Sequence, residues 1–523
     1  MHIEVIPIGG SLPNTAKNAA FLITDSWNDW FKYNTMYNAF YFDNEGVSHH
    51  IGDVKIGEFG MTKDQKRPRV PEKFELLSGD FFSLGQDDSY YQNLNALGED
   101  VRNKFLIALR DIAKDPELFE RALKEEVTGV SLLRFVSDQA VKSQFRRIAQ
   151  GGARLTAFSF TYTPQPWGRQ KKSPTIHFEV TPETTPPTNV HVLIGRNGVG
   201  KTHTVNQMTN ALVRPDDRLH GTFKWNLTDD SDTIEAFSSI ISVSFSAFDP
   251  FEPIPTRENK LSSVRYQYIG LKHTVKDEDG SLRPPKSPDD LASDFGKSVE
   301  VIITQAAKRD RWKRALQLLE SDRIFKHTEI WRLIEEYQQL LITLEHTDAL
   351  KSLRKKARET YTKLSSGHKI VLLTVTRVVE TLEERSLVIV DEPEAHLHPP
   401  LLSAFIRSLS DLLIDRNGVA IIATHSPVIL QEVPRNCAWR IRRVGQESEI
   451  ERPRQETFGE NVGTLTQVIF GLEVTDSGFH KMISEAVDEG LSYKEIVARF
   501  SDQLGDEARG IARSLIATRE DQE

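Results

Sequence analysis

The sequence predicts an α/β fold built on a parallel β-sheet with crossover helices. Two apolar runs, residues 387–390 and 419–423, have the length of buried strands, and a helix-length segment separates them. A third apolar run, Val190–Ile194, leads into a glycine-rich turn and then a helical pattern. Alternation of strand and helix is typical of a parallel sheet, because parallel neighbours need a crossover connection.

Composition restricts the classes of protein to consider. The 523 residues allow about three domains. Hydrophobic residues make up 38% of the chain and charged residues 27%, which excludes a disordered, collagen-like or mucin-like protein. The net charge of −9 excludes nucleic-acid binding by bulk charge alone, although a local basic patch stays open. Cys437 is the single cysteine, which leaves no intramolecular disulfide and no cysteine-based zinc site.

The hydrophobic pattern also bears on location. No apolar run approaches about 20 residues, the length needed to cross a bilayer. The N-terminal sequence has neither the basic region nor the long apolar region of a signal peptide. We therefore expect a cytoplasmic protein with no membrane partner.

The periodicity of the sequence predicts three regions. Residues 1–150 suggest a mixed α/β domain, with short strands first and helices after them. Residues 151–430 hold the strands described above and a charged helical insert at about 291–360. Residues 431–523 look mostly helical, and Ser492 and Glu495 form a capping box there. This C-terminal region either docks a partner subunit or packs on its own domain.

A complete phosphate-binding loop follows the strand Val190–Ile194. Its pattern is G-x-x-x-x-G-K-[ST], in the strand-to-helix context that the motif requires. The residues are Gly195, Arg196, Asn197, Gly198, Val199, Gly200, Lys201 and Thr202, with His203 next. Glycines let backbone N–H groups surround phosphates, and the helix N-terminus favours an anion. Lys201 is placed for the β- and γ-phosphates and Thr202 for Mg²⁺, so we expect nucleotide binding.

Polar residues end two of the predicted strands. Asp391 and Glu392 follow the run 387–390, and ligands bind beyond the carboxyl ends of such strands. We expect Asp391 to face Mg²⁺ and Glu392 to face the γ-phosphate, where a carboxylate can activate the attacking water. His425 follows the run 419–423 and is expected at the same sheet edge. Each feature alone suits an ordinary turn, but together with the phosphate loop they indicate hydrolysis.

A fourth element precedes an apolar helix. Ser365, Ser366 and Gly367 lie in the segment LSSGH. Serine hydroxyls and free N–H groups at a helix N-terminus make an anion site. Taken alone, this segment is only a helix cap.

These four elements, in this order, resemble an ABC-class ATPase over roughly residues 155–430. GRNGVGKT is similar to Walker A, LSSGH to the family signature, VIVDE to Walker B with its catalytic glutamate, and THSP to the switch-histidine loop. The resemblance implies an ABC-type head with an added antiparallel β subdomain, and ATP and Mg²⁺ as cofactors. It implies catalytic roles for Glu392 and His425 and Mg²⁺-side roles for Thr202 and Asp391. It also implies a head-to-tail dimer or higher homo-oligomer, in which Ser365 and Gly367 reach ATP bound by the other subunit.

The segment DEPEAHLHP after Walker B narrows the resemblance to the branch with OLD-type and other phage-defence ATPases. The stretch SVSFSAFDPF and the large N-terminal region resemble the PtuA-type ATPase subunits of Septu and retron-linked Septu systems. We therefore expect a regulator of a bacterial antiviral system that controls a separate nuclease, of HNH type if the system is Septu-like. DNA or a retron RNA–DNA is an expected nucleic-acid partner. The alternatives are a DNA-repair ATPase, a transporter ATPase subunit and a scaffold that rarely hydrolyses ATP.

The sequence departs from the ABC pattern at several positions. His368 replaces the usual signature glutamine, and residues 247–250 stand where a Q-loop glutamine is expected. The aromatic residue that stacks on adenine is unassigned, with Phe158, Phe160 and Tyr162 as weak candidates. Three basic clusters either bind nucleic acid or form solvated, ion-paired surfaces. They are Lys308, Arg309, Arg311, Lys313 and Arg314 around Trp312; Arg354, Lys355, Lys356 and Arg358; and Arg440, Arg442 and Arg443. In the first cluster, the nucleic-acid alternative includes stacking of Trp312 on a base.

Overall fold

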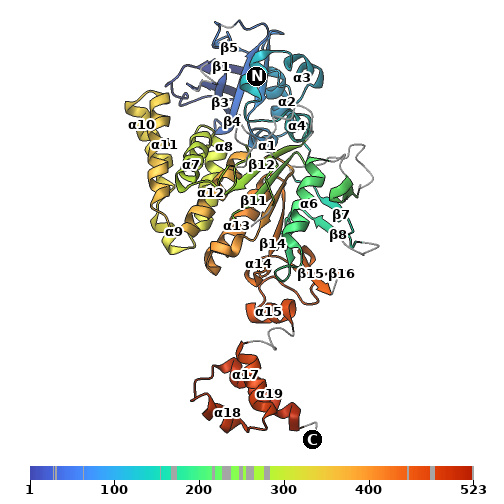
Figure 1. The fold of residues 1–523 in the computed structure, drawn as a ribbon. Helices are drawn as coiled ribbons and strands as arrows, with labels where there is room; N and C mark the ends of the chain where they lie inside the picture. The colour runs from blue at the N-terminus through green and yellow to red at the C-terminus, as the bar shows by residue number, and fades with distance from the viewer. Residues whose placement is uncertain are drawn as a thin grey trace.

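The computed structural model describes residues 1–26, 29, 32–62, 64–152, 155–166, 173–214, 218–226, 237–246, 251–254, 264–275, 283–444, 447–471 and 478–520. Figure 1 shows an N-terminal sheet domain at one end, a large sheet with covering helices in the middle, and a small helical unit at the other end. Among the residues in these ranges, no helix combines the length and apolar character that crossing a bilayer requires.

The central sheet has the strand order β12-β11-β13-β14-β9-β15-β16. Its strands are β9 (Val190–Ile194), β11 (Ser239–Ser244), β12 (Arg265–Gly270), β13 (Ser386–Asp391), β14 (Val419–Thr424), β15 (Ala438–Val444) and β16 (Glu447–Glu451). All neighbours are parallel except the β15–β16 hairpin at one edge. The expected α/β fold with a parallel sheet is therefore present. The predicted boundary at residue 430 falls inside this sheet, since charged residues mask the strand character of β15 and β16.

The two faces of the sheet bury alternate residues of the same strands. On β13, Val388 and Val390 pack in one hydrophobic cluster with α12 and α13, whereas Leu387 and Ile389 pack in another with α6. The helices are α6 (Lys201–Val213), α12 (Ser366–Thr381), α13 (Pro399–Asp415), α14 (Pro427–Leu430) and α15 (Val462–Phe470). Burial on both faces explains why these strands read as continuous apolar runs.

A small antiparallel sheet lies beside α6, as the ABC-type resemblance implied. Its strands are β7 (Phe158–Thr163), β8 (Ile176–Val180) and β10 (Thr222–Trp225), in the order β10-β7-β8. A short helix, η3 (Arg218–His220), connects α6 to this sheet. The sheet shares its hydrophobic cluster with α6 and with the central sheet, so the two sheets form one unit around the phosphate loop.

The helical insert extends from residue 288 to residue 362. It comprises α7 (Pro288–Ile303), α8 (Ala306–Leu319), α9 (Arg323–His327), α10 (Arg332–Thr343) and α11 (His346–Thr362). Trp312 on α8 is fully buried, and its Nε1 donates a hydrogen bond to Thr376 Oγ1 on α12 at 3.0 Å. The suggestion that Trp312 stacks on a nucleobase is therefore wrong, because the indole fixes the insert to the ATPase core.

The N-terminal domain contains a mixed sheet and several short helices. The sheet order is β5-β1-β2-β3-β4-β6. The strands are β1 (His2–Ile6), β2 (Ala19–Thr24), β3 (Met36–Phe42), β4 (Ser48–Glu58), β5 (Lys73–Phe74) and β6 (Phe81–Gly85). The helices are α1 (Asp88–Ala96), α2 (Glu99–Ala108), α3 (Pro116–Ala122), η1 (Thr128–Leu132), α4 (Asp138–Ala140), η2 (Val141–Phe145) and α5 (Arg146–Ala149). The domain has a hydrophobic core of its own.

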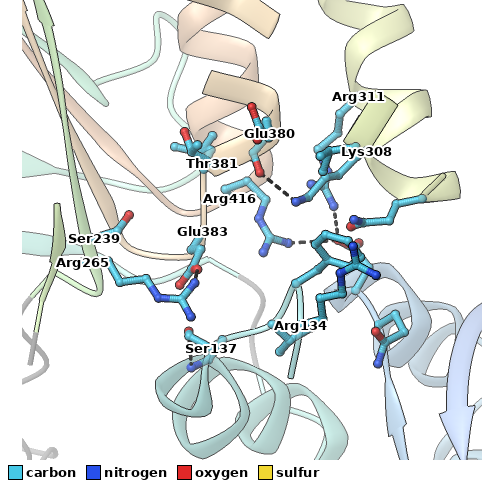
Figure 2. Close-up of a pocket in the computed structure, with 18 of the residues that line it drawn as sticks. Arg134, Ser137, Ser239, Arg265, Lys308, Arg311, Glu380, Thr381, Glu383 and Arg416 are labelled. Carbon is cyan, nitrogen blue, oxygen red and sulfur yellow. Dashed lines mark hydrogen bonds and ion pairs between the residues drawn. The ribbon is translucent and has the colours of Figure 1, made fainter. Parts of the chain in front are cut away.

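Buried ion pairs join the N-terminal domain to the ATPase core (Figure 2). Arg311 on α8 pairs with Asp87, which caps α1, and Arg416 pairs with Asp88 at 2.6 Å. Burial alone would raise the pKa of Asp87, but Arg311 and Arg416 hold it below its usual range. A cavity of about 250 Å³ lies at this junction, and Lys308 lines it. Lys308 donates a hydrogen bond to the Glu380 carbonyl at 2.7 Å, and burial lowers its pKa to about 8.

The C-terminal unit consists of α17 (Gly478–Asp488), α18 (Tyr493–Arg499) and α19 (Asp506–Glu520). Ser492 and Glu495 form the predicted capping box at the start of α18. The three helices pack around a small core of Ile483, Val487, Ile496 and neighbouring residues. These helices therefore bury their apolar residues against one another.

Candidate nucleotide-binding site

The phosphate loop connects β9 to α6 in the context that its motif requires. Gly198 and Gly200 have φ values of 79° and 98°, in the left-handed region that glycine tolerates best. A Cβ on Gly195 would lie 2.3 Å from the Ile441 carbonyl oxygen of β15, so the close approach of these strands requires glycine. The loop therefore places Lys201 at the N-terminus of a thirteen-residue helix, where phosphates are favoured.

Lys201 is buried at the centre of the site, with 4% of its surface exposed. Its Nζ donates a hydrogen bond to the Arg196 carbonyl at 2.9 Å and lies 3.8 Å from Glu392 Oε1. Burial lowers the pKa of this ammonium, and Glu392, Glu394 and Asp391 offset part of that shift. A cation held among carboxylates at a helix N-terminus is suited to bind the terminal phosphates of a nucleotide.

The predicted Mg²⁺-side residues meet across the sheet edge. Thr202 Oγ1 donates a hydrogen bond to Asp391 Oδ1 at 3.1 Å, although 189 positions separate the two residues. Asp391 ends β13 and is buried. A hydroxyl and a carboxylate oxygen are ligands of the kind that Mg²⁺ prefers, and the ion keeps several waters in such sites. These two side chains therefore suit an ion that would neutralise charge on the phosphates.

Glu392 adopts a constrained backbone conformation. Its φ and ψ are 45° and 56°, in the left-handed region that few non-glycine residues occupy. The Glu392 N–H donates to the Ala423 carbonyl at 2.9 Å, which links this residue to the end of β14. Such strain is concentrated at functional positions, because surrounding structure must stabilise it.

Glu394 connects the segment after β13 to the loop after β14. Its Oε1 accepts hydrogen bonds from Thr424 Oγ1 at 2.5 Å and from the His425 N–H at 2.7 Å. His425 Nδ1 lies 3.1 Å from Glu394 Oε1 and 3.8 Å from Glu392 Oε1. The sequence analysis did not predict a role for Glu394. Its place in DEPEAHLHP, two residues after Glu392, could have indicated that it lies at the same site.

A backbone hydrogen bond also connects the histidine loop to the phosphate loop. The Gly195 N–H donates to the Thr424 carbonyl at 3.4 Å. Because β14 lies between β9 and β13, the loops after all three strands meet at one edge. The structure thus brings together Lys201, Thr202, Asp391, Glu392 and His425, as the sequence predicted. Their roles in hydrolysis stay predictions.

The signature-like segment packs beside the short helix that follows Glu392. Ser365 caps α12 and its Oγ lies 2.6 Å from His368 Nδ1, while Ser366 begins the helix. A Cβ on Gly367 would lie 2.6 Å from the His396 carbonyl, so this segment packs against η4 (Pro393–His396). Asp322 of the insert also reaches it, with Oδ1 3.2 Å from His368 Nε2.

A cavity of about 210 Å³ adjoins the phosphate loop. Val199, Gly200 and His203 line it together with Ile441 and Ile450. Burial and the nearby His220 lower the pKa of His203, so its ring is neutral at pH 7. Its apolar side chains, together with the His203 ring and a few polar groups such as Gln207, make this cavity a candidate position for a nucleobase.

The aromatic residues proposed for adenine stacking are unsuitable. Phe158, Phe160 and Tyr162 are at most 2% exposed. Phe160 stacks on Phe178 with ring centroids 4.9 Å apart, and the Tyr162 hydroxyl donates to the His220 carbonyl at 2.7 Å. These side chains fill the core between the two sheets. The predicted Q-loop segment, residues 247–250, lies outside the described residues.

Several residues of the basic clusters are engaged within the chain. Arg311 is buried and pairs with Asp87 and Asp415. Lys356 pairs with Glu336 at 3.1 Å, and Arg354 lies 3.8 Å from Glu300. These contacts favour the ion-paired alternative over nucleic-acid binding for the cations involved.

Sequence comparison identifies a full-length relative. Protein ea59 of Escherichia phage lambda is 40% identical over 538 residues, and the alignment covers 100% of this chain and 99% of that protein. This chain belongs to the ea59 family. Residues 280–431 of the ea59-family chain also match the family model described as "AAA domain, putative AbiEii toxin, Type IV TA system". That range contains LSSGH, Asp391, Glu392 and His425, and with the phosphate loop it supports an ABC-like P-loop ATPase.

Solved structures with partial likeness to this ea59-family chain include proteins of ABC transporters. One, a metal-chelate type ABC transporter in an inward-facing conformation, has a TM-score of 0.30 and 14% identity. The matched region covers 60% of this chain and 88% of the transporter chain. The ADP form of MJ1267, an ATP-binding cassette of an ABC transporter, has a TM-score of 0.29 and 12% identity. The matched region covers 61% of this chain and 98% of the MJ1267 chain.

Proposed function

We propose that this ea59-family protein binds Mg²⁺-ATP between the phosphate loop and Asp391 and hydrolyses it. The observation that carries the proposal is the meeting of Lys201, Thr202, Asp391 and Glu392 at one sheet edge. Lys201 binds the terminal phosphates, and Thr202 and Asp391 hold the ion. Glu392 accepts the proton of the attacking water, which is the role of a positioned carboxylate in phosphoryl transfer. Mg²⁺, when bound, neutralises the developing charge on the phosphate oxygens.

We also propose that two chains complete each site head to tail. Ser365 and Ser366 form an exposed helix N-terminus that packs against η4 through Gly367, so a second molecule can approach the two serines. The hydroxyl and N–H groups there are suited to contact the γ-phosphate bound by the other chain. Dimerisation and hydrolysis would then depend on each other.

The first test replaces the proposed general base. Glu392→Gln should retain ATP binding but lower phosphate release by at least about a hundredfold, because the amide cannot accept the proton. With ATP present, light scattering should show this variant as a stable dimer. Glu359→Gln, an exposed change on α11, is the matched control and should behave like the wild type. Wild-type turnover in Glu392→Gln would overturn the assignment of the base.

Mixing two inactive variants tests the shared sites. Lys201→Ala lacks the phosphate-binding cation, and Ser365→Glu places a carboxylate against the incoming phosphate. Each should be inactive alone, whereas a mixture should regain hydrolysis, because mixed dimers hold one intact composite site. A mixture that stays inactive would argue against the head-to-tail arrangement.

We infer that the ATP cycle controls a separate effector nuclease in a bacterial antiviral system. The supporting observation is the matched family description, which names a putative AbiEii toxin and a type IV TA system. The test is purification of the protein from its host under its own promoter. A co-purifying nuclease subunit would support this role. A protein that comes alone and hydrolyses ATP faster with DNA would instead support the DNA-repair alternative.

A further inference from the structure

Three potential metal ligands converge beside the signature-like segment. Asp322 Oδ1 lies 3.2 Å from His368 Nε2, and Asp322 Oδ2 lies 3.1 Å from His398 Nε2. One potential ligand atom from each residue lies within 4.8 Å of the other two. Donor atoms around a tetrahedral Zn²⁺ are about 3.3 Å apart, given bonds of about 2.0–2.2 Å. Each imidazole nitrogen lies at about that distance from one oxygen of the Asp322 carboxylate, Oδ1 for His368 and Oδ2 for His398.

The backbone holds each of these residues in place. Asp322 is the N-cap of α9, and its Oδ1 accepts the Phe325 N–H at 2.7 Å. His368 lies in the first turn of α12 and is buried, with the Phe325 ring stacked on it. His398 precedes Pro399, which disfavours helical backbone and keeps it at ψ 154°. A ligand set fixed before binding loses little conformational entropy when an ion binds.

The surroundings also suit a bound ion. His368 Nδ1 lies 2.6 Å from Ser365 Oγ, a contact that can fix the tautomer and leave the Nε2 lone pair facing Asp322. Two electron-rich atoms facing each other at this distance need a proton or a cation between them. The His398 side chain is 47% exposed, so its ring can adjust and water can take a fourth position.

We propose that Asp322, His368 and His398 bind a divalent transition-metal ion of the zinc class. Two imidazole nitrogens and one carboxylate oxygen are typical ligands of Zn²⁺ with an open fourth position. The ion joins three elements: the insert through α9, the signature-like segment through α12, and the start of α13. None of the three ligands belongs to the proposed Mg²⁺ position at Thr202 and Asp391, although Ser365 links the metal site to the signature-like segment, and no nucleotide is needed.

Metal titration of the untagged full-length protein tests the site. After dialysis against chelator, the nucleotide-free protein should bind one equivalent of Zn²⁺ by calorimetry. Co²⁺ should give the visible absorption of a tetrahedral complex, and Zn²⁺ should abolish it. Asp322→Asn and His398→Ala should each weaken binding by at least about tenfold. Asn still caps a helix, so loss of metal in Asp322→Asn would not reflect loss of α9.

His396→Ala is the matched control, because His396 is an exposed histidine two residues from His398. It should bind Zn²⁺ like the wild type. Zn²⁺ should also raise the Tm of the wild type and of His396→Ala, but not of Asp322→Asn. Equal Zn²⁺ affinity in the wild type, Asp322→Asn and His398→Ala would overturn the proposal and leave a hydrogen-bonded His–Asp–His bridge. Because no nucleotide is present, this outcome is independent of whether the protein hydrolyses ATP.

Discussion

At the scale of single residues, Glu394 controls the position of the histidine loop. One carboxylate oxygen accepts hydrogen bonds from both Thr424 and the His425 backbone. His425 is therefore positioned by a residue other than the proposed general base, Glu392. Glu394 acts here as a positioning residue, and its effect on hydrolysis would be exerted through His425.

We expect Glu394→Ala to lower kcat by roughly a hundredfold, since small misplacements of reacting groups have effects of this size. KM for ATP should change little, because Lys201 and Thr202 remain in place. Glu394→Gln retains an oxygen that can accept both hydrogen bonds and should recover most of the turnover. Steady-state phosphate release measures all three proteins. A Gln variant as slow as the Ala variant would show that the negative charge, rather than positioning, matters.

The residues of the candidate site differ in how far the sequence could predict them. Lys201 and Thr202 lie in a motif whose spacing is set by phosphate geometry, and Asp391 ends a strand of unmistakable composition. Asp322 comes from the insert, 46 residues before His368, and only the packing of α9 on α12 brings it there. Local patterns carry no information on such contacts.

At the scale of elements, β9 contains a buried histidine. His191 is fully buried one residue into this strand, and within the described chain neither ring nitrogen has a hydrogen-bond partner. Phe178 packs edge-on against the ring, with centroids 5.2 Å apart. Burial, with a contribution from Arg452, lowers the pKa of His191 to about 3. The folded protein therefore keeps this ring neutral where the unfolded chain, with a pKa of about 6.5, takes up a proton.

This difference predicts acid sensitivity of the central sheet. Stability from the neutral ring is complete above pH 6.5 and is lost as the pH falls toward 3, because only the unfolded state gains the proton. At pH 5 the loss is roughly 2 kcal/mol for a folded pKa of about 3. His191→Leu should remove that part of the loss, as measured by urea unfolding at pH 8 and pH 5. His327→Leu, an exposed change, should not; equal acid sensitivity in wild type and His191→Leu would contradict the prediction.

Strand and helix prediction succeeded where burial dictates composition. β13 and β14 are buried at every position and were recognised as apolar runs. The hairpin β15–β16 was missed, because Arg440, Arg442 and Glu449 alternate with apolar residues at the sheet edge. Trp312 was misjudged for a related reason: the basic residues around it suggested a surface, whereas the helix turns its indole inward.

At the scale of the whole molecule, ion pairs between residues far apart in the sequence hold the N-terminal domain against the ATPase core. Asp88 and Arg416 are 328 positions apart and meet at 2.6 Å in a buried setting. A buried pair of this kind specifies one docking geometry, since separating the partners leaves charges without compensation. The sequence predicted the two regions but gave no indication of how they dock, because isolated charges are indistinguishable from surface residues.

Helix α13 connects this junction to the nucleotide edge of the sheet. It begins at Pro399, directly after His398, and ends at Asp415, beside Arg416. Its seventeen residues form a continuous helix about 25 Å long. Because the helix is rigid over this length, a change in the direction of its first turn also changes the position of its last turn. One continuous helix therefore starts beside the segment that follows Glu392 and ends next to the arginine whose ion pairs hold the N-terminal domain.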